Sequence, residues 1–384
     1  MKRPIGSLLL LVVLVLLPFV VLRATAQVDR IVIAAGTDED HALQAISNEP
    51  DAQKKLTMYE DFVQKFSSNP AAVAYGNWQI SQAYQATGDL AKALDYGDKA
   101  LAGSPRNLDI LVSQANVALQ AKNNAKLMDY AAKGGEVCAS IGKQPKPEGT
   151  SDEEFARKVN EEKSNSQSSC EFMETSGFNA ISGENDPKLR MAGIEKYTAA
   201  FPNSKFQDQV ASYAIYTLSP GQLNDPGRLV AFSEKALATN PNSLPALLTL
   251  AGFYVEDPKP GSMTKAITYS QKVIEIAKPD APDAENKSKA AAGVAHSTIG
   301  YAYLKQEKSQ AAIPELKAAV ALLKGQDETS YAVALYRLGF AYAKLSRTSE
   351  AREVLTEAVK IQGPMQAMSQ ELLTKVNAAR AKGK

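Results

Sequence analysis

Residues 299–322 read IGYAYLKQEKSQAAIPELKAAVAL, and residues 338–359 repeat the pattern as LGFAYAKLSRTSEAREVLTEAV. A glycine, a tyrosine and two alanines keep the same spacing in both copies, with the second set 39 positions after the first: Gly300, Tyr303, Ala312 and Ala319, then Gly339, Tyr342, Ala351 and Ala358. An internal repeat indicates one structural unit used again, so the repeat is the first guide to the fold.

The spacing within each copy predicts a pair of helices. Ala312 and Ala319 are two helical turns apart and share one face, while Gly300 and Tyr303 fall on the helix before them. Small residues let two antiparallel helices approach closely, and the tyrosine fills the space beside the next pair. Because such a hairpin cannot bury its apolar face alone, the hairpins must stack. The sequence therefore predicts an all-α solenoid of stacked helical hairpins.

This pattern resembles the tetratricopeptide repeat (TPR), which has small residues at fixed positions of both helices, an aromatic residue in the first helix and a proline after the second. A further copy starts at Ala74 and carries the same features: Ser81, Tyr84, Gly88, Asp89, Ala93, Ala100 and Pro105. The resemblance covers most of residues 40–380. It implies a right-handed TPR-like α-solenoid, and it says little about function.

The N-terminus has the three parts of a secretory signal. Lys2 and Arg3 precede an apolar run at residues 8–22, and Ala24-Thr25-Ala26 follows as a cleavage site. We therefore expect export to a periplasmic or extracellular space, with cleavage after Ala26. The alternative is an uncleaved N-terminal membrane anchor, although the run is short for a spanning helix and contains Pro18.

Charge excludes two classes of partner. The chain has 43 Lys and Arg against 42 Asp and Glu, and the predicted signal contains three of the basic residues and no acidic one. A nearly neutral mature chain favours neither nucleic acid nor an anionic membrane surface, so any membrane contact would come from an uncleaved signal. Oligomeric state cannot be read from these features.

Composition and repeat register divide the chain into five segments. Residues 142–186 interrupt the array with a Pro-, Gly- and charge-rich loop and a long polar helix, NEEKSNSQSS in its middle. The other segments are the signal (1–26), an arm, a capping helix and TPR-like repeats (27–141), more TPR-like repeats (187–363), and a capping helix with a basic tail (364–384).

Two cysteines flank the loop of this insertion. Cys138 ends the repeat before it and Cys170 lies in the long helix after it. In an exported protein two cysteines favour a disulfide, which would hold the insertion in place. Two separate buried thiols are the alternative.

No residue pattern predicts catalysis, a metal site or a cofactor. His41 and His296 are the only histidines, and neither belongs to a metal-binding spacing such as HExxH or CxxC. We therefore expect a protein that is not an enzyme and has no cofactor.

The TPR resemblance implies a ligand groove instead. Certain positions of each first helix face the inner groove in that family, and here they carry aromatic and polar residues. The chief candidates are Tyr75, Trp78, Gln82, Tyr301, Tyr336 and Phe340, and the same register adds Gln85, Asp109, Val112, Asn116, Leu119, Ser297, Leu304, Lys305 and Lys344. Aromatic residues are typical anchors for a peptide, but at helical spacing they also serve as packing.

The favoured hypothesis is a non-enzymatic exported scaffold that binds a protein or peptide through its concave groove. The first alternative is a structural or accessory subunit of an envelope complex that uses its convex face. A remote third is hydrolase activity in the insertion.

The predicted cleavage of the secretory signal can be tested. Intact-mass analysis of the chain purified from its native host should give a mature protein that begins with Gln27, because the signal is removed after Ala26. A protein that still begins with Met1 would favour the membrane anchor.

Overall fold

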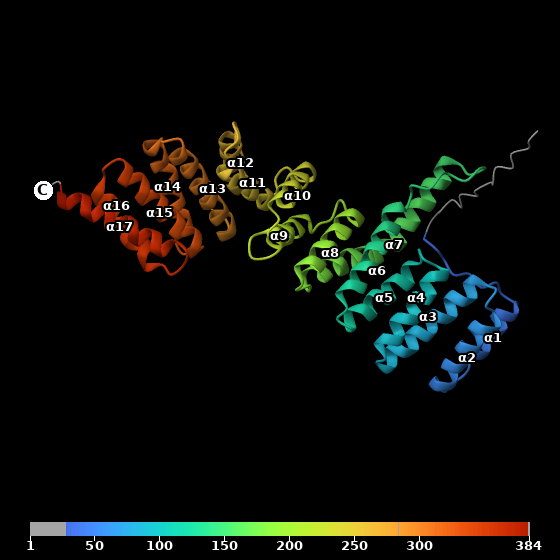
Figure 1. Ribbon diagram of the computed structural model, residues 1–384. Helices are drawn as coiled ribbons and strands as arrows, with labels where there is room; N and C mark the ends of the chain where they lie inside the picture. Colours follow the sequence, from blue (N-terminus) through green and yellow to red (C-terminus); the bar gives the residue numbers. More distant parts are fainter. Residues whose placement is uncertain (1–27, 283, 383–384) are drawn as a thin grey trace, which may run out of the picture. The chain divides into compact units, whose positions relative to one another are not determined.

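The computed structural model describes residues 28–382 apart from residue 283, so the predicted signal at residues 1–26 lies outside it (Figure 1). The described residues form seventeen helices and no strand. The helices are α1 (Asp38–Ser47), α2 (Ala52–Lys65), α3 (Pro70–Thr87), α4 (Leu90–Gly103), α5 (Leu108–Gln120), α6 (Asn124–Ser140), α7 (Asp152–Ser182), α8 (Pro187–Ala200), α9 (Gln207–Leu218), α10 (Pro226–Thr239), α11 (Leu244–Glu256), α12 (Ser262–Ala277), α13 (Asn286–Lys305), α14 (Ser309–Leu323), α15 (Glu328–Lys344), α16 (Thr348–Lys360) and α17 (Met365–Lys382).

The chain forms two compact units. Unit 1 comprises residues up to Ser113 together with Lys133–Glu171, and unit 2 comprises Gln114–Ala132 together with Phe172–Lys384. The divisions fall inside α5, α6 and α7, so these helices contribute residues to both units. Each unit is described below by itself, and the five sequence segments remain a prediction.

Helices of unit 2 follow one packing rule. From α11 to α17, each helix packs against the next one, and α11, α13 and α15 also pack against one another in succession. This is the contact pattern of hairpins stacked in chain order, in which each unit touches its neighbours. The structure confirms the predicted all-α stack of helical hairpins.

Glycines allow the two helices of a hairpin to pack closely. A Cβ placed on Gly300 of α13 would lie 2.5 Å from Leu316 Cγ of α14, and one on Gly339 of α15 would lie 2.5 Å from Leu355 Cγ of α16. The alanines that repeat with these glycines are fully buried: Ala312, Ala319, Ala351 and Ala358. The repeated small residues are therefore the points where the two helices of a hairpin meet.

Unit 1 begins with an arm, residues 28–36, which precedes α1. Ile33 of this arm packs beside Ile46, Phe62 and Phe66, the apolar core shared by α1, α2 and the start of α3. α3 and α4 then pack as a hairpin. Gly88 ends α3 with a left-handed φ of 83°, and Asp89 accepts a hydrogen bond from the Lys92 amide to begin α4.

α7 is one unbroken helix across Asp152–Ser182. Ser151 begins it by accepting a hydrogen bond from the Glu154 amide. The polar middle, which by composition could have interrupted the helix, contains two buried polar side chains, Glu162 and Ser166. They are four residues apart and so share a face, and this face belongs to the candidate site described below.

Helices within residues 28–382, residue 283 excepted, include none that is long and apolar enough to cross a bilayer.

Glycine substitution tests the packing of the hairpins. Gly339→Ala should lower the free energy of unfolding by about 1–2 kcal/mol, because the cost of overpacking against Leu355 exceeds the gain in helix propensity. Gly252→Ala in α11 is the matched control, since a Cβ there meets nothing within 4 Å. Chemical denaturation should show the control unchanged or slightly more stable, and equal losses for both variants would contradict the packing role.

Candidate functional site

A cavity of about 410 Å³ in unit 1 brings together two candidate residues of the first repeat and one of the next. Tyr75 and Trp78 of α3 and Asp109 of α5 line it, together with arm residues 28–31 and one face of α7. We call it the arm cavity. Gln82, the third groove candidate on α3, is exposed and does not line it.

Trp78, which lines the arm cavity, has an unused hydrogen-bond donor. Its side chain is half-buried, and its indole Nε1 is fully buried with no acceptor among the described residues. A buried donor without a partner costs free energy, and a ligand or a water with an oxygen at this point would recover it.

Next to Tyr75, burial raises the pKa of the Tyr59 hydroxyl to about 12, with Tyr75 itself adding to the shift. That hydroxyl is therefore neutral at pH 7.

α7 supplies the polar wall of the arm cavity. The wall residues are Glu162, Asn165, Ser166 and Ser169. Their spacing of three, four and seven residues places them on one face of the helix. These four residues were not among the predicted site residues, because the polarity of the run NEEKSNSQSS does not distinguish one face of the helix from the other. The signal that could have found them is the helical period inside the run.

The arm lies across this site in an extended course, and its main chain holds it there. Asp29 N–H donates to the Arg106 carbonyl (3.2 Å), and the Asn107 side-chain amide donates to the Asp29 carbonyl (3.0 Å). The Arg106 amide donates to Asp29 Oδ2 (3.0 Å). Arg30 then pairs with Glu162 of α7, with 2.9 Å between Nη2 and Oε2. The arm thus joins the α4–α5 turn to α7.

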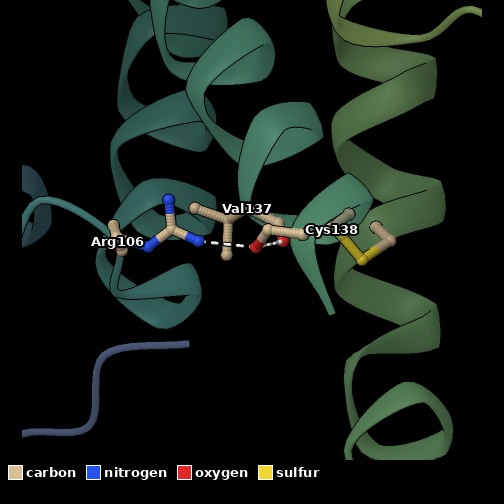
Figure 2. The surroundings of a disulfide bond; sticks show 5 residues. Arg106, Val137 and Cys138 are labelled. Atoms are coloured by element: carbon tan, nitrogen blue, oxygen red, sulfur yellow. Dashed lines mark hydrogen bonds between the residues drawn. A yellow bond between two sulfur atoms is a disulfide. The ribbon is translucent and has the colours of Figure 1, made fainter. Parts of the chain in front are cut away.

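A disulfide joins Cys138 of α6 to Cys170 of α7, with a Cα–Cα distance of 5.9 Å. Figure 2 shows its surroundings at the end of α6, where the Arg106 guanidinium donates to Ser140 Oγ and Ser140 Oγ donates to the Val137 carbonyl. The disulfide holds the polar face of α7 within reach of Arg30. The contacts in unit 1 therefore form a closed ring. It runs from the α4–α5 turn through the arm to α7, and returns through the disulfide and the end of α6.

The three remaining chief candidates lie in unit 2 and are half-buried: Tyr301, Tyr336 and Phe340. Tyr336 and Phe340 of α15 pack against a core cluster that includes Leu338 and Leu355. Tyr301 of α13 packs beside Leu250 and Tyr254. These aromatic residues thus contribute to packing between helices.

Tyr301 also stacks on a buried cation. The guanidinium carbon of Arg337 lies 4.2 Å from the Tyr301 ring centre, and Arg337 donates to the carbonyl and the hydroxyl of Ser297. Burial lowers the pKa of the Arg337 guanidinium below its usual value, but an arginine stays charged in proteins. Lys305 adds a second cation 5.2 Å from the same ring. Lys305 also pairs with Glu256 of α11, with 2.6 Å between Nζ and Oε2, so an acidic side chain offsets part of this positive charge.

A second cavity, of about 240 Å³, lies in unit 2 among α8, α9 and α10. Its lining is largely apolar, and several of its polar side chains already pair with each other, as Asn240 does with Asp208 and Tyr197 with Ser204. It offers less than the arm cavity to the main chain of a peptide, which needs polar partners along its length.

No group of three or more His, Cys, Asp or Glu side chains could hold a metal ion within the part of the chain that the structure describes. His296 lies in α13 and pairs with Glu315 of α14, at 2.6 Å from Nδ1 to Oε2. Its position between two helices of a hairpin is a packing position.

The fold defines an all-helical repeat protein, and comparison with known families agrees at one place. Residues 332–363, within α15 and α16, match the family described as Tetratricopeptide repeat. No curated protein matches the chain in sequence.

Similar solved structures include two proteins that are named as TPR proteins and one chain of a larger assembly. The TPR domain of P58(IPK) is 13% identical, with 91% of this chain and 99% of that chain covered and a TM-score of 0.32. A tetratricopeptide repeat protein from Parabacteroides merdae is 12% identical, with 88% and 98% covered and a TM-score of 0.32. A chain of the APC/C hetero-tetramer Cut9-Hcn1 is 13% identical, with 90% and 91% covered and a TM-score of 0.29.

Loss of the disulfide should weaken unit 1. The bond spans 32 positions of the sequence, and a loop of that length predicts that the double variant Cys138→Ala, Cys170→Ala loses about 3–4 kcal/mol of unfolding free energy. Denaturant titration of variant and wild type measures the loss. Thiol labelling of the denatured, unreduced wild type should detect no free cysteine, and two labelled thiols per chain would contradict the pairing.

Proposed function

We propose that the chain is an exported, non-enzymatic scaffold that binds a protein or peptide partner, and that the arm cavity is its main binding site. The observation that carries this proposal is Trp78, which lines the cavity and whose buried indole N–H has no acceptor among the described residues. Helical-repeat proteins commonly bind partners along the surfaces that their stacked units create.

The chemistry of the arm cavity suits a peptide. Tyr75 and Trp78 offer aromatic surface, while Asp109, Glu162 and Asn165 offer charged and polar groups on the facing walls. Peptide sites typically combine an aromatic anchor with a few polar groups that fix the orientation of the ligand. The α4–α5 turn already pairs with an extended main chain, that of the arm, through Arg106 and Asn107.

The two sets of groove candidates differ in what surrounds them. In unit 2, Tyr301, Tyr336 and Phe340 pack against core clusters, so truncation there would disturb stability together with any binding. In unit 1, Tyr75 and Trp78 line a cavity. We therefore assign the anchoring role to Tyr75 and Trp78 and a secondary role to the unit 2 residues.

Peptide selection tests the site without a known partner. A displayed peptide library should yield peptides that shift the emission of Trp78, the single tryptophan of the chain. By calorimetry, Trp78→Ala should weaken binding of a selected peptide by about 2 kcal/mol or more, as expected for a buried aromatic anchor. Trp78→Phe, which keeps a ring but removes the N–H, should weaken it about 2- to 10-fold.

Tyr84→Phe is the matched control. Tyr84 lies on the same helix, stacks on Tyr96 of α4 and does not line the cavity. Its substitution also removes one polar group and keeps a ring, so binding should be unchanged. Selected peptides that bind Trp78→Ala as tightly as wild type would place the interaction surface elsewhere.

A further inference from the structure

The arm neither fills the arm cavity nor offers an acceptor to Trp78. With residues 28–31 in place, the arm cavity still measures about 410 Å³, and the Trp78 N–H still lacks an acceptor. A second hollow of about 440 Å³ lies beside Arg30, lined by Lys158, Glu161 and Glu162 of α7. A ligand that filled this space and offered an oxygen to Trp78 would gain contacts that the arm does not make.

Half of the four hydrogen bonds that join Asp29 and Arg30 to the rest of unit 1 are open to any extended peptide. Two of the three hydrogen bonds at Asp29 use its main-chain N–H and C=O, so they do not depend on the side chain. Recognition of an extended segment typically takes affinity from such main-chain bonds and specificity from pockets for alternate side chains. The arm shows this alternation, since Arg30 and Val32 are exposed while Ile31 and Ile33 are half-buried.

Charge identifies the side chain that the site selects. The Glu162 side chain is only 10% exposed, whereas its partner Arg30 is 64% exposed. A buried carboxylate needs a cation nearby, and here the cation reaches it from solvent, where another Lys or Arg could take its place. Asp109 adds negative charge to the arm cavity, whereas in the second hollow Glu161 is paired with Arg157 and Lys158 also lines the wall.

We propose that the partner binds as an extended segment with a basic side chain directed at Glu162, and that the arm occupies this place until the partner displaces it. The inference rests on the proposed function, because it names the ligand chemistry of the same cavity. Ile33 stays in the core beside Phe62, so the displaced arm remains tethered and competes as an intramolecular ligand. An incoming peptide therefore faces a high effective concentration of the arm.

The test uses a labelled peptide with the arm's own sequence, acetyl-VDRIVI-amide, and a second one in which Gln replaces the Arg. Fluorescence anisotropy measures both on the full chain and on the double variant Asp29→Ala, Arg30→Ala, which weakens the arm's attachment. The variant should bind the Arg peptide at least about tenfold more tightly than wild type, because the competing arm is released. It should also prefer the Arg peptide over the Gln peptide by about tenfold or more.

Glu162→Gln in the double-variant background should abolish the preference between the two peptides. Glu153→Gln, which removes the same charge from an exposed position of α7, should keep it. Equal binding of the Arg peptide by wild type and double variant, or a preference that survives Glu162→Gln, would overturn the inference. Trp78-dependent binding of library peptides would still support the proposed function in that case, whereas failure of every peptide to bind would overturn both.

Discussion

The close approach of paired helices is the constraint on which the stacked array depends. A Cβ on Gly339 would lie 2.5 Å from Leu355 Cγ, and one on Gly300 would lie equally close to Leu316. With glycine at these points the leucine of the second helix fills the space under the first, and fully buried alanines continue the contact. The two helices of each hairpin then pack closely together, and the hairpin presents one apolar side to the next hairpin. Stacking follows because burial of that side is the main source of stability in such arrays.

The sequence could predict this part of the fold because the determinants are local and periodic. Gly300, Ala312 and Ala319 lie within one short stretch, and their spacing alone places them on facing helices. Exposure of the aromatic candidates could not be predicted in the same way, since it depends on which distant segments lie over them. Phe340 packs against the core of its own unit, while Trp78 shares a cavity with an arm and a helix far away in sequence. The two have similar register positions and different environments.

Unit 1 differs from a plain repeat array in its ring of contacts around the arm cavity. The long helix α7 is polar, and the Cys138–Cys170 bond and the Arg30–Glu162 pair hold its middle against the rest of unit 1. One face of this polar helix thereby forms a wall of the arm cavity. Composition showed that this segment is hydrophilic, but it gave no indication of the face that Glu162 and Ser166 share.

The arm contacts also impose an order on folding. Asp29 is separated from Arg106 by 77 positions, and Arg30 from Glu162 by 132. A chain made from its N-terminus therefore presents the arm long before the surfaces that receive it exist, and contacts between distant residues carry the largest loop-closure cost. The first described segment to emerge is thus the last to settle in unit 1. During that interval the newly made arm has none of these contacts, so it is more accessible to chaperones and proteases than the arm of the folded chain.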